Sequence, residues 1–475
     1  MTVRSQAYSV PSTQGRRRRC LAMAGACAAA ALALAGCGNS AASQTASHAL
    51  ASGSGVVTVT AASNIKTLSD CAKLTPSPCY GVDHFLAAYG VEPLHSRGIN
   101  GRGQSVVLLE FAPNQTSSAT DSNLRHDFAL FDGLFGLPAV RLQVITRFAR
   151  MGDPYLAGGE EAMDAEMVHA VAPAATIRIV LIPPGTGDLQ ATGAGLINAL
   201  RLAPSLGGTV AITAGISEGC VTHVGAANLN SALTTDENRH VTVIASAGDN
   251  GAAGGPCSGV VSASVRAVNL PASDPLVLAV GGTTLQASPT TGAYVDETAW
   301  NAPAPSLPAG APKPPPSALA QLLATGSNGG FSSVFSRPAY QDGVPGIGHM
   351  RGVPDVSADA DGHTGMAVAF SLTRGNVVTS ADGTSASAPF WAGLVALADQ
   401  DAGHALGFIN PTIYRIGVSS SYHRAFHDIT TGSNTITFPA GTVTGYQAGP
   451  GWDPVTGWGS PDAQILVPLL AAGGS

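Results

Sequence analysis

The sequence predicts an α/β domain in which helices cover both faces of a mostly parallel β-sheet. Two features carry this prediction: short, apolar, β-rich runs that end in glycine or small residues, and helix-like stretches between several of them. Strands that read as continuous apolar runs are typical of parallel sheets that are buried on both faces. A chain of 475 residues that is 45% hydrophobic and 11% charged can build a large core, as one domain or as two.

The apolar runs give the expected strands, and no internal repeat connects them. A segment rich in proline and alanine, 302–320, is expected to form an exposed loop between them. The expected strands, in chain order, are 105–111, 176–182, 209–213, 241–248, 276–282 and 365–370.

The N-terminus has the pattern of an export signal over residues 1–36. Four arginines, 16–19, precede a long apolar run that ends in small residues before Cys37. The sequence Leu-Ala-Gly-Cys at 34–37 resembles a bacterial lipobox, which predicts lipidation of Cys37, and the paired arginines permit twin-arginine export. An uncleaved anchor, or cleavage without lipid, are the alternatives. Residues 37–70, rich in small and polar residues up to about 65, are expected to be a flexible tether.

Charge restricts the partners of the exported chain. Residues 1–36 contain five arginines and no acid, so their removal lowers the formal charge from −7 to −12. An acidic protein lacks the basic surface that nucleic acids require, and nucleic-acid binding is not expected. No second apolar run reaches about 18 residues, so we expect contact with a membrane only through the N-terminal lipid.

Cysteine usage agrees with export. Two of the seven cysteines lie in the signal and Cys37 is the lipidation candidate, which leaves Cys71, Cys79, Cys220 and Cys257. Four cysteines allow three disulfide connectivities. We favour the local pairs 71–79 and 220–257, with free buried thiols as the alternative. No Cys or Cys/His cluster suggests zinc.

The stretch ADGTSASAP at 381–389 is how a nucleophilic serine is often presented. Ser385 follows a tight glycine turn and precedes an expected helix over 386–400. A serine hydroxyl becomes a good nucleophile only when a base takes its proton. The candidate bases upstream of Ser385 are His169, His363 and a pair of acids in the stretch 159–173.

The stretch GEEAMDAEMVHAVAP at 159–173 is expected to be a helix that ends before Pro173. At about 100° per residue, Glu160 and Asp164 fall within the apolar stripe that should face the core, whereas His169 falls on the opposite, solvent side. His363 lies in a turn-like segment, so both histidines are expected at the surface. Two buried acids one turn apart can share a proton and act as a base in acid. Two acids that face water are the equally weighted alternative.

Several ordered motifs resemble the sedolisin family of serine-carboxyl peptidases. The stretch 160–166, with acids at 160, 164 and 166, and the GTSAS stretch at 383–387 resemble its two central motifs. The resemblance extends over roughly 79–465 and implies a single, subtilisin-like catalytic domain, which we place at 71–467. The other stretches that match are 79–91, 245–251, 268–285, 297–301, 328–341, 352–361, 428–434 and 448–462.

The resemblance assigns the catalytic residues. It implies that Ser385 is the nucleophile, Glu160 the general base, Asp164 the residue that orients the base, and Asp249 a donor to the oxyanion. Asp249 alone would read as part of a turn. As a donor it must be protonated, and a carboxylate base also favours a low working pH, so the activity should be confined to acid. The expected substrates are peptides or denatured proteins, and a monomer is expected.

The resemblance also implies one structural Ca²⁺ ion in the loops of 428–462. Its ligands would be the Asp428 and Asp453 carboxylates with the carbonyl oxygens of Ile429, Gly449 and Gly451. Carboxylates and backbone carbonyls form the hard oxygen cage that calcium prefers. The alternative is a pair of acidic surface turns.

Three features depart from the family pattern. About 40 residues separate Cys37 from the catalytic domain, too few for a large folded prodomain. Ala214 stands in place of a bulky aromatic that helps shape the substrate cleft, and Asp382 stands where Ser or Gly commonly precedes Gly-Thr-Ser. Because of these departures, an alternative hypothesis is a catalytically silent lipoprotein that binds peptides or a partner. A third hypothesis is a histidine-dependent peptidase of the subtilisin type.

Overall fold

Five of the six expected strands lie in one sheet of the computed structural model. The structure describes Cys71 and residues 78–112, 122–148, 156–157, 159–183, 189–237, 240–254, 265–303, 324–372, 375–438 and 441–473. Within these residues the main sheet has the order β11-β10-β8-β6-β1-β5-β3, with β16 pairing to β10. Its strands are β1 Ser105–Phe111, β3 Arg141–Ile145, β5 Thr176–Ile182, β6 Thr209–Ile212, β8 Thr242–Ser246, β10 Leu278–Ala287, β11 Tyr294–Ala299 and β16 Val356–Asp359.

The sheet is parallel except at one edge. The strands β3, β5, β1, β6, β8, β10 and β16 pair in parallel with their neighbours, whereas β11 returns antiparallel to β10. The α/β fold with a mostly parallel, helix-flanked sheet is therefore confirmed. The described residues all belong to one compact unit of the chain, 37–475.

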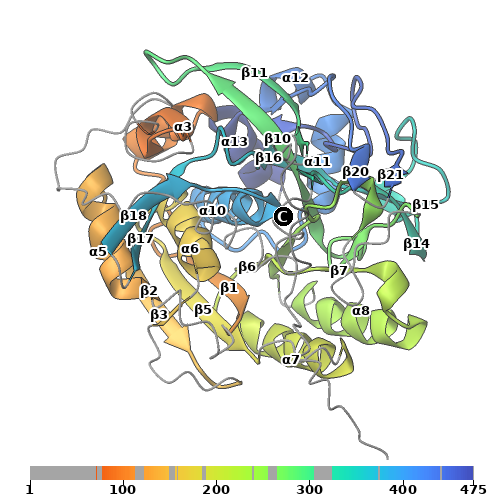
Figure 1. The fold of residues 1–475 in the computed structure, drawn as a ribbon, viewed down its shortest axis with the longest axis horizontal. Coiled ribbons are helices and arrows are strands. Elements are labelled where there is room, and N and C mark those ends of the chain that lie inside the picture. Colours follow the sequence, from red (N-terminus) through yellow and green to blue (C-terminus); the bar gives the residue numbers. More distant parts are fainter. Residues whose placement is uncertain are drawn as a thin grey trace, which may run out of the picture. The chain divides into compact units, whose positions relative to one another are not determined.

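Alternate side chains of each central strand enter two different cores. Along β1, Val106 and Leu108 join the core beneath α6 and α10, while Val107 and Leu109 join the core beneath α7 and α8. Figure 1 shows α7 and α8 together on one side of the sheet, away from α6 and α10. Because both faces are covered, the strands need apolar residues at every position.

The helices connect or cap these strands. They are α3 Val82–Ala88, α4 Glu92–Ser96, α5 Leu124–Phe135, α6 Gly159–Val171, α7 Leu189–Leu202, α8 His223–Glu237, α10 Thr384–Ala402, α11 Asn410–Gly417, α12 Tyr422–Ala425 and α13 Ala463–Gly473. Short 3₁₀ turns are η1 Ala203–Ser205, η2 Glu218–Cys220, η3 Gly251–Ala253 and η5 Ala339–Gln341.

The central helix α10 begins and ends at glycines with positive φ. Gly383 precedes it at φ 79° and Gly403 follows it at φ 76°. The helix is buried from Thr384 through Asp399, as a helix that is apolar on all sides must be. Glycine tolerates positive φ, so these two residues can turn the chain sharply into and out of the core.

The expected strand at 365–370 was wrongly placed in the main sheet. It forms β17, which pairs antiparallel with β18 as a separate hairpin packed on α5 and α6. Apolar residues on both sides of the run gave the pattern of a central strand, because helices cover this hairpin.

The small strand pairs are β2 Ser122–Asn123 with β4 Leu156–Ala157, β7 Ile216–Ser217 with β9 Asn269–Leu270, β12 Asn301–Ala302 with β13 Thr325–Gly326, β14 Gly330–Ser336 with β15 Met350–Val353, β17 Ala367–Leu372 with β18 Gly375–Ser380, β19 Phe426–His427 with β22 Ser460–Pro461, and β20 Ile436–Phe438 with β21 Gly441–Val443.

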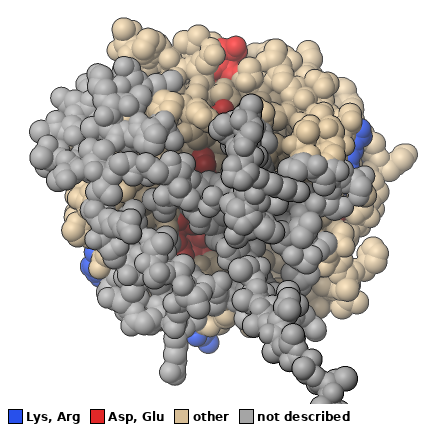
Figure 2. Space-filling view, in the orientation of Figure 1, with Lys and Arg blue, Asp and Glu red and all other residues tan. Residues whose placement is uncertain are grey.

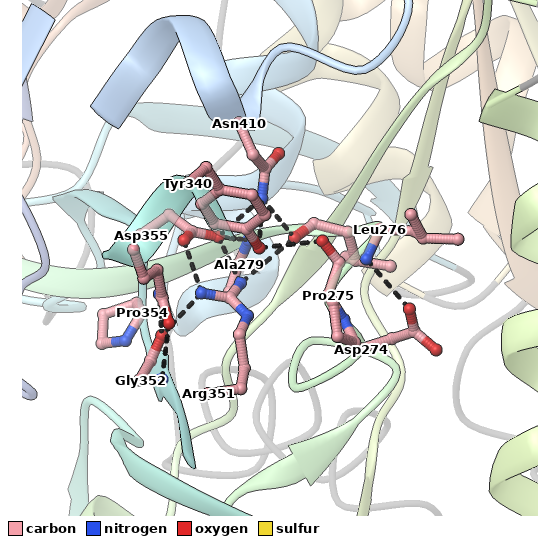
Figure 3. Close-up of polar contacts among 12 residues, drawn as sticks. Asp274, Pro275, Leu276, Ala279, Tyr340, Arg351, Gly352, Pro354, Asp355 and Asn410 are labelled. Atoms are coloured by element: carbon pink, nitrogen blue, oxygen red, sulfur yellow. Dashed lines mark hydrogen bonds and ion pairs between the residues drawn. The ribbon is translucent and has the colours of Figure 1, made fainter. Parts of the chain in front are cut away.

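A buried ion pair fastens the amino ends of β10 and β16. The Arg351 guanidinium donates to both oxygens of Asp355, at 2.7 and 2.6 Å, and both side chains have no exposed surface. Figure 3 shows the two groups pointing at each other beneath the ring of Tyr340. Asp355 also accepts from the Ala279 N–H and the Tyr414 hydroxyl, at 2.8 Å each. These donors offset the cost of removing the charges from water.

Several expectations concern residues outside the described part. The signal, the tether, the lipidation site Cys37 and nearly all of the proline-rich segment lie there. A disulfide joins Cys71 to Cys79, with 5.3 Å between their Cα atoms. Cys220 is also disulfide-bonded, and its expected partner Cys257 is not among the described residues. No helix in the described part is long and apolar enough to cross a membrane.

Candidate active site

Polar side chains gather where three neighbouring strands reach their carboxyl ends. Glu110 lies near the end of β1, Thr213 directly follows β6, and Asp249 follows β8. The register places Leu109 beside Ile212 and Ile212 beside Ala245, so the residues after these positions meet at one edge. Ligand and catalytic sites of parallel α/β sheets form at this edge.

Ser385 reaches the same edge from the first turn of α10, and its residue is 2% exposed. Its backbone N–H is one of the first four of the helix, which have no acceptor within the helix. The preceding Thr384 donates its N–H and its hydroxyl to Asp249 Oδ1, at 2.8 Å each. These bonds tie the serine turn to the loop after β8.

The helix α6 brings two acids to Ser385. Glu160 and Asp164 lie one turn apart, with residue exposures of 9% and 0%, so the hypothesis of two buried acids is the one that the structure bears out. The whole helix is buried, which the amphipathic interpretation did not anticipate. His169 was wrongly expected at the surface: it has no exposed surface, because α5 and β17 cover the face that was expected to meet solvent.

The histidines are not arranged to serve Ser385. His169 Nε2 lies 3.0 Å from Asp132 Oδ1 and 2.9 Å from the Pro138 carbonyl oxygen. The His363 side chain is 74% exposed and pairs with Asp361 at 2.9 Å. The ionisable side chain that neighbours the Ser385 hydroxyl is instead that of Glu160.

Glu110 is a third buried acid that the sequence analysis missed. It is 3% exposed and faces Asp164. Burial raises the pKa of Glu110 to about 7, while Asp164 and Thr213 act in the opposite direction. An acid at the penultimate position of an otherwise apolar strand is the signal that would have found it, since buried carboxyls are rare without a function.

Burial also raises the pKa of Glu160 and of Asp164 well above the usual value. For Glu160 the neighbouring Ser385 hydroxyl opposes this shift, and the charge of Glu110 adds to it; for Asp164 the charges of Glu110 and Glu160 add to it. Both oxygens of Glu160 and of Asp164, and one of Glu110, have no hydrogen-bond partner of normal geometry. Ionisable groups packed this way share protons among themselves, and a catalytic hydrogen bond to Ser385 can tighten when substrate binds.

Asp249 has one oxygen occupied and one directed at the serine turn. Its Oδ2 lies 2.7 Å from the position that a Cβ on Gly383 would take. Burial raises the pKa of Asp249, against the two bonds from Thr384. Because Oδ1 already accepts two bonds, a proton on this acid belongs on Oδ2. A protonated Oδ2 next to the start of α10 is a donor beside the Ser385 N–H.

Two positions that depart from the family pattern lie at this site. Asp382 is half-buried, and burial followed by the charges of Asp249 and Asp361 raises its pKa to about 8. Its charge is also one of those that raise the pKa of Glu160. Ala214, half-buried, follows Thr213 at the end of β6. Figure 2 shows acidic atoms from the top edge to the middle of the face in view, whereas Lys and Arg atoms lie at its left, right and lower edges.

The expected calcium ligands come together in the C-terminal loops. Gly451 N–H donates to Asp428 at 3.0 Å and Gly449 N–H to Asp453 at 3.2 Å, so one turn connects both carboxylates. Burial raises the pKa of Asp453 to about 6. No salt bridge joins either acid to a basic side chain within the described residues.

These residues are of the types expected for a calcium site, and in this structure both carboxylates accept further hydrogen bonds, Asp453 from Val455 and Thr456 and Asp428 from the Tyr422 hydroxyl. Two carboxylates that converge on a glycine-rich turn without a basic partner present the oxygen chemistry that Ca²⁺ prefers. No group of three or more His, Cys, Asp or Glu able to hold a metal occurs in the described part of the chain. The expected cage contains only two such side chains, and backbone carbonyls provide the rest.

A parallel sheet with a serine at the start of its central helix, facing carboxyls across the strand ends, defines a serine peptidase fold of the subtilisin type. The family model described as Peptidase_S8, Subtilase family, matches residues 156–438. The chain belongs to this family, and it is similar to the sedolisins. It is 35% identical over 390 residues to kumamolisin of Bacillus sp. (strain MN-32), covering 79% of this chain and 61% of that protein.

Two further comparisons agree. The chain is 31% identical over 365 residues to sedolisin of Pseudomonas sp. (strain 101), covering 74% of this chain and 56% of that protein. It superposes with a TM-score of 0.67 and 25% identity on Pseudomonas sedolisin, a serine-carboxyl proteinase solved with two molecules of pseudo-iodotyrostatin, over 84% of this chain and 100% of that one. The chain thus spans about three fifths of the length of the curated relatives.

Proposed function

We propose that this chain is an acid-acting serine-carboxyl peptidase that hydrolyses peptide bonds through an acyl-enzyme on Ser385. The observation that supports it most is the set of buried carboxyls at Ser385, with Glu160 directly beside the hydroxyl. A histidine is not needed in this arrangement. The similarity to the sedolisins supports peptides and denatured proteins as the class of substrate.

The reaction follows from the positions of four groups. Ionised Glu160 takes the proton of Ser385 as Oγ bonds to the substrate carbonyl carbon, and the carbonyl π electrons move to oxygen. The oxyanion accepts from the Ser385 N–H and from protonated Asp249. Glu160 then gives its proton to the leaving amine as the C–N bond breaks. Water repeats the cycle on the ester and restores Ser385.

Asp164 orients Glu160, and Glu110 extends the set by one acid. A base needs one ionised carboxyl among them, while Asp249 needs its proton. Acid conditions below the raised pKa of Asp249 satisfy the second requirement. Sharing of protons within the buried set allows the first.

The proposal also includes a calcium ion, a second disulfide, export and a lipid anchor. Asp428, Asp453 and the carbonyls of Ile429, Gly449 and Gly451 would hold one structural Ca²⁺, which would fasten the C-terminal loops. Cys220 would pair with Cys257. The chain would be exported by its signal, and Cys37 would carry a lipid that tethers a monomeric enzyme to the bacterial envelope.

The test is the hydrolysis of a denatured protein between about pH 2.5 and 8 by the wild type and three variants. Ser385→Ala and Glu160→Gln should each abolish activity, and His363→Ala should keep it, because the exposed His363 serves as a matched control. A folded wild type without activity at any pH would favour the silent peptide-binding lipoprotein. Retained activity in Glu160→Gln would contradict the assignment of the base.

A further inference from the structure

The proposed reaction leaves three buried ionisable residues of α6 without a role: Glu161, Glu166 and His169. Glu166 and His169 lie on the side of the helix that faces away from Ser385, toward α5 and the β17–β18 hairpin. Both are fully buried. Burying a carboxyl without a cation is costly, so its presence in a core calls for a physical explanation.

Glu166 has few partners for a charged group. Its Oε2 accepts one hydrogen bond, from the Ala369 N–H of β17 at 2.8 Å, and its Oε1 has none. The strand β17 presents no ionisable side chain. The charged groups that face Glu166 are Asp127 and Asp132 of α5, which are acids as well. His169, one turn along α6, is held by Asp132 and by the Pro138 carbonyl.

We propose that Glu166 is a pH-sensitive latch: as a neutral carboxylic acid it holds α6 against β17 and α5, and its ionisation releases that contact. Only a neutral carboxyl suits a site with a single N–H donor and two neighbouring acids. An ionised one must either gain water or separate the helix from the hairpin.

The direction of the pH dependence follows from linkage. Burial raises the pKa of Glu166 well above its usual value, with smaller contributions from Asp127 and Asp132 in the same direction. Such a group stabilises the fold fully below its unfolded pKa, and this contribution is lost as the pH rises toward the folded pKa. Between those two values the unfolding equilibrium constant grows about tenfold per pH unit for this one group.

The latch would act on the active site through the helix. Glu160 and Asp164 lie on the same helix α6 as Glu166, in its first half. Loosening of the contact with β17 therefore displaces the base and its orienting acid together. The enzyme would then lose its catalytic arrangement on transfer from acid to neutral medium, beyond any effect of protonation on the reaction itself.

The test separates stability from catalysis by incubating and assaying at different pH. The purified protein and its Glu166→Gln variant are held at pH 7.5, and samples are assayed at the acid optimum and by circular dichroism. The amide of Gln keeps the shape without the charge. We expect the half-life at pH 7.5 to lengthen about tenfold or more in Glu166→Gln, with unchanged kcat/KM in acid. Equal half-lives would overturn the proposal.

Glu297→Gln is the matched control. Glu297 is also buried, but hydroxyls of Tyr89, Thr283 and Ser460 all donate to it, so its charge is solvated by the protein. Burial raises the pKa of Glu297 as well, but the three hydroxyls oppose that shift, so its replacement should lengthen the half-life by less than Glu166→Gln does. Circular dichroism gives the result even if the peptidase proposal fails.

A second measurement needs no variant. Amide exchange of the wild type, corrected for the intrinsic effect of pH, should show that α6 and β17 lose protection between acid and pH 7.5 while β6 keeps it. Equal changes in all three segments would contradict the latch, whether or not Glu166→Gln folds.

Discussion

The account of the oxyanion donor can be tested at Asp249, because asparagine and alanine separate two requirements there. Asp249 accepts two bonds from Thr384 through Oδ1 and is proposed to donate through a protonated Oδ2. Asparagine retains an acceptor and offers a permanent N–H donor in the same geometry. Alanine removes both. The Thr384 bonds fix which way the amide points, since the N–H and hydroxyl of Thr384 need an oxygen.

The expected magnitudes differ accordingly. Loss of one oxyanion donor costs about 2.7–4 kcal/mol of transition-state stabilisation, so Asp249→Ala should lower kcat about 10²–10³-fold. The Thr384 N–H would also lose its acceptor, at a cost of about 1–3 kcal/mol in stability. Asp249→Asn should keep kcat within about tenfold of the wild type in acid, since both contacts persist.

The pH dependence of kcat/KM in Asp249→Asn reports whether Asp249 is protonated when it acts. The raised pKa of Asp249 means that the wild type holds the proton in acid and loses the donor as pH rises through that value. The amide of Asn cannot lose its donor, so the alkaline limb of kcat/KM should move upward in Asp249→Asn. Hydrolysis of a fluorogenic peptide across the pH range measures this. If Asp249→Asn is as inactive as Asp249→Ala with an intact fold, the donor role is refuted.

Three further outcomes are expected. Glu110→Gln should lower kcat/KM in acid by about tenfold or less, because Glu110 with a pKa of about 7 is already neutral there, whereas Glu110→Ala should cost more by removing one of the polar neighbours of Asp164. Equal effects in steady-state assays would contradict this. Gly383→Ala should abolish activity without unfolding the chain by circular dichroism, since φ is 79° and the new Cβ would lie 2.7 Å from Asp249 Oδ2; full activity would contradict the geometry. Removal of calcium with EGTA should lower Tm by about 3–5 °C if the ion is at about 100 times its Kd, and Mg²⁺ should not restore it; an unchanged Tm in calorimetry would argue against the site.

The strands were predictable because their environment is uniform. β1 and β5 are buried over most of their length, so their sequences are mostly apolar and their limits match the prediction. The run at β17 has the same pattern for a different reason, since a helix and a hairpin partner bury it outside the sheet. Local sequence records burial, but not which neighbour provides it.

The site shows the same limit. Glu160 and Asp164 were identified from helix phase and resemblance, and they are buried as expected. His169 was misplaced because helix phase assumes one wet face, and α6 has none. Glu110 stands out in the sequence as an acid in a mostly apolar strand, but its place beside Asp164 follows from the pairing of β1 with β6 and its contact with α6, which the sequence alone does not give.

The most direct test of the central claim is the pH profile of Ser385 labelling by a fluorophosphonate in the wild type, in Glu160→Gln and in His363→Ala. If Glu160 is the base, the wild type and His363→Ala should be labelled in acid, and Glu160→Gln should not be labelled. Labelling of Glu160→Gln at the wild-type rate, or labelling that peaks near neutral pH and is lost in His363→Ala, would contradict a carboxylate as the base for Ser385.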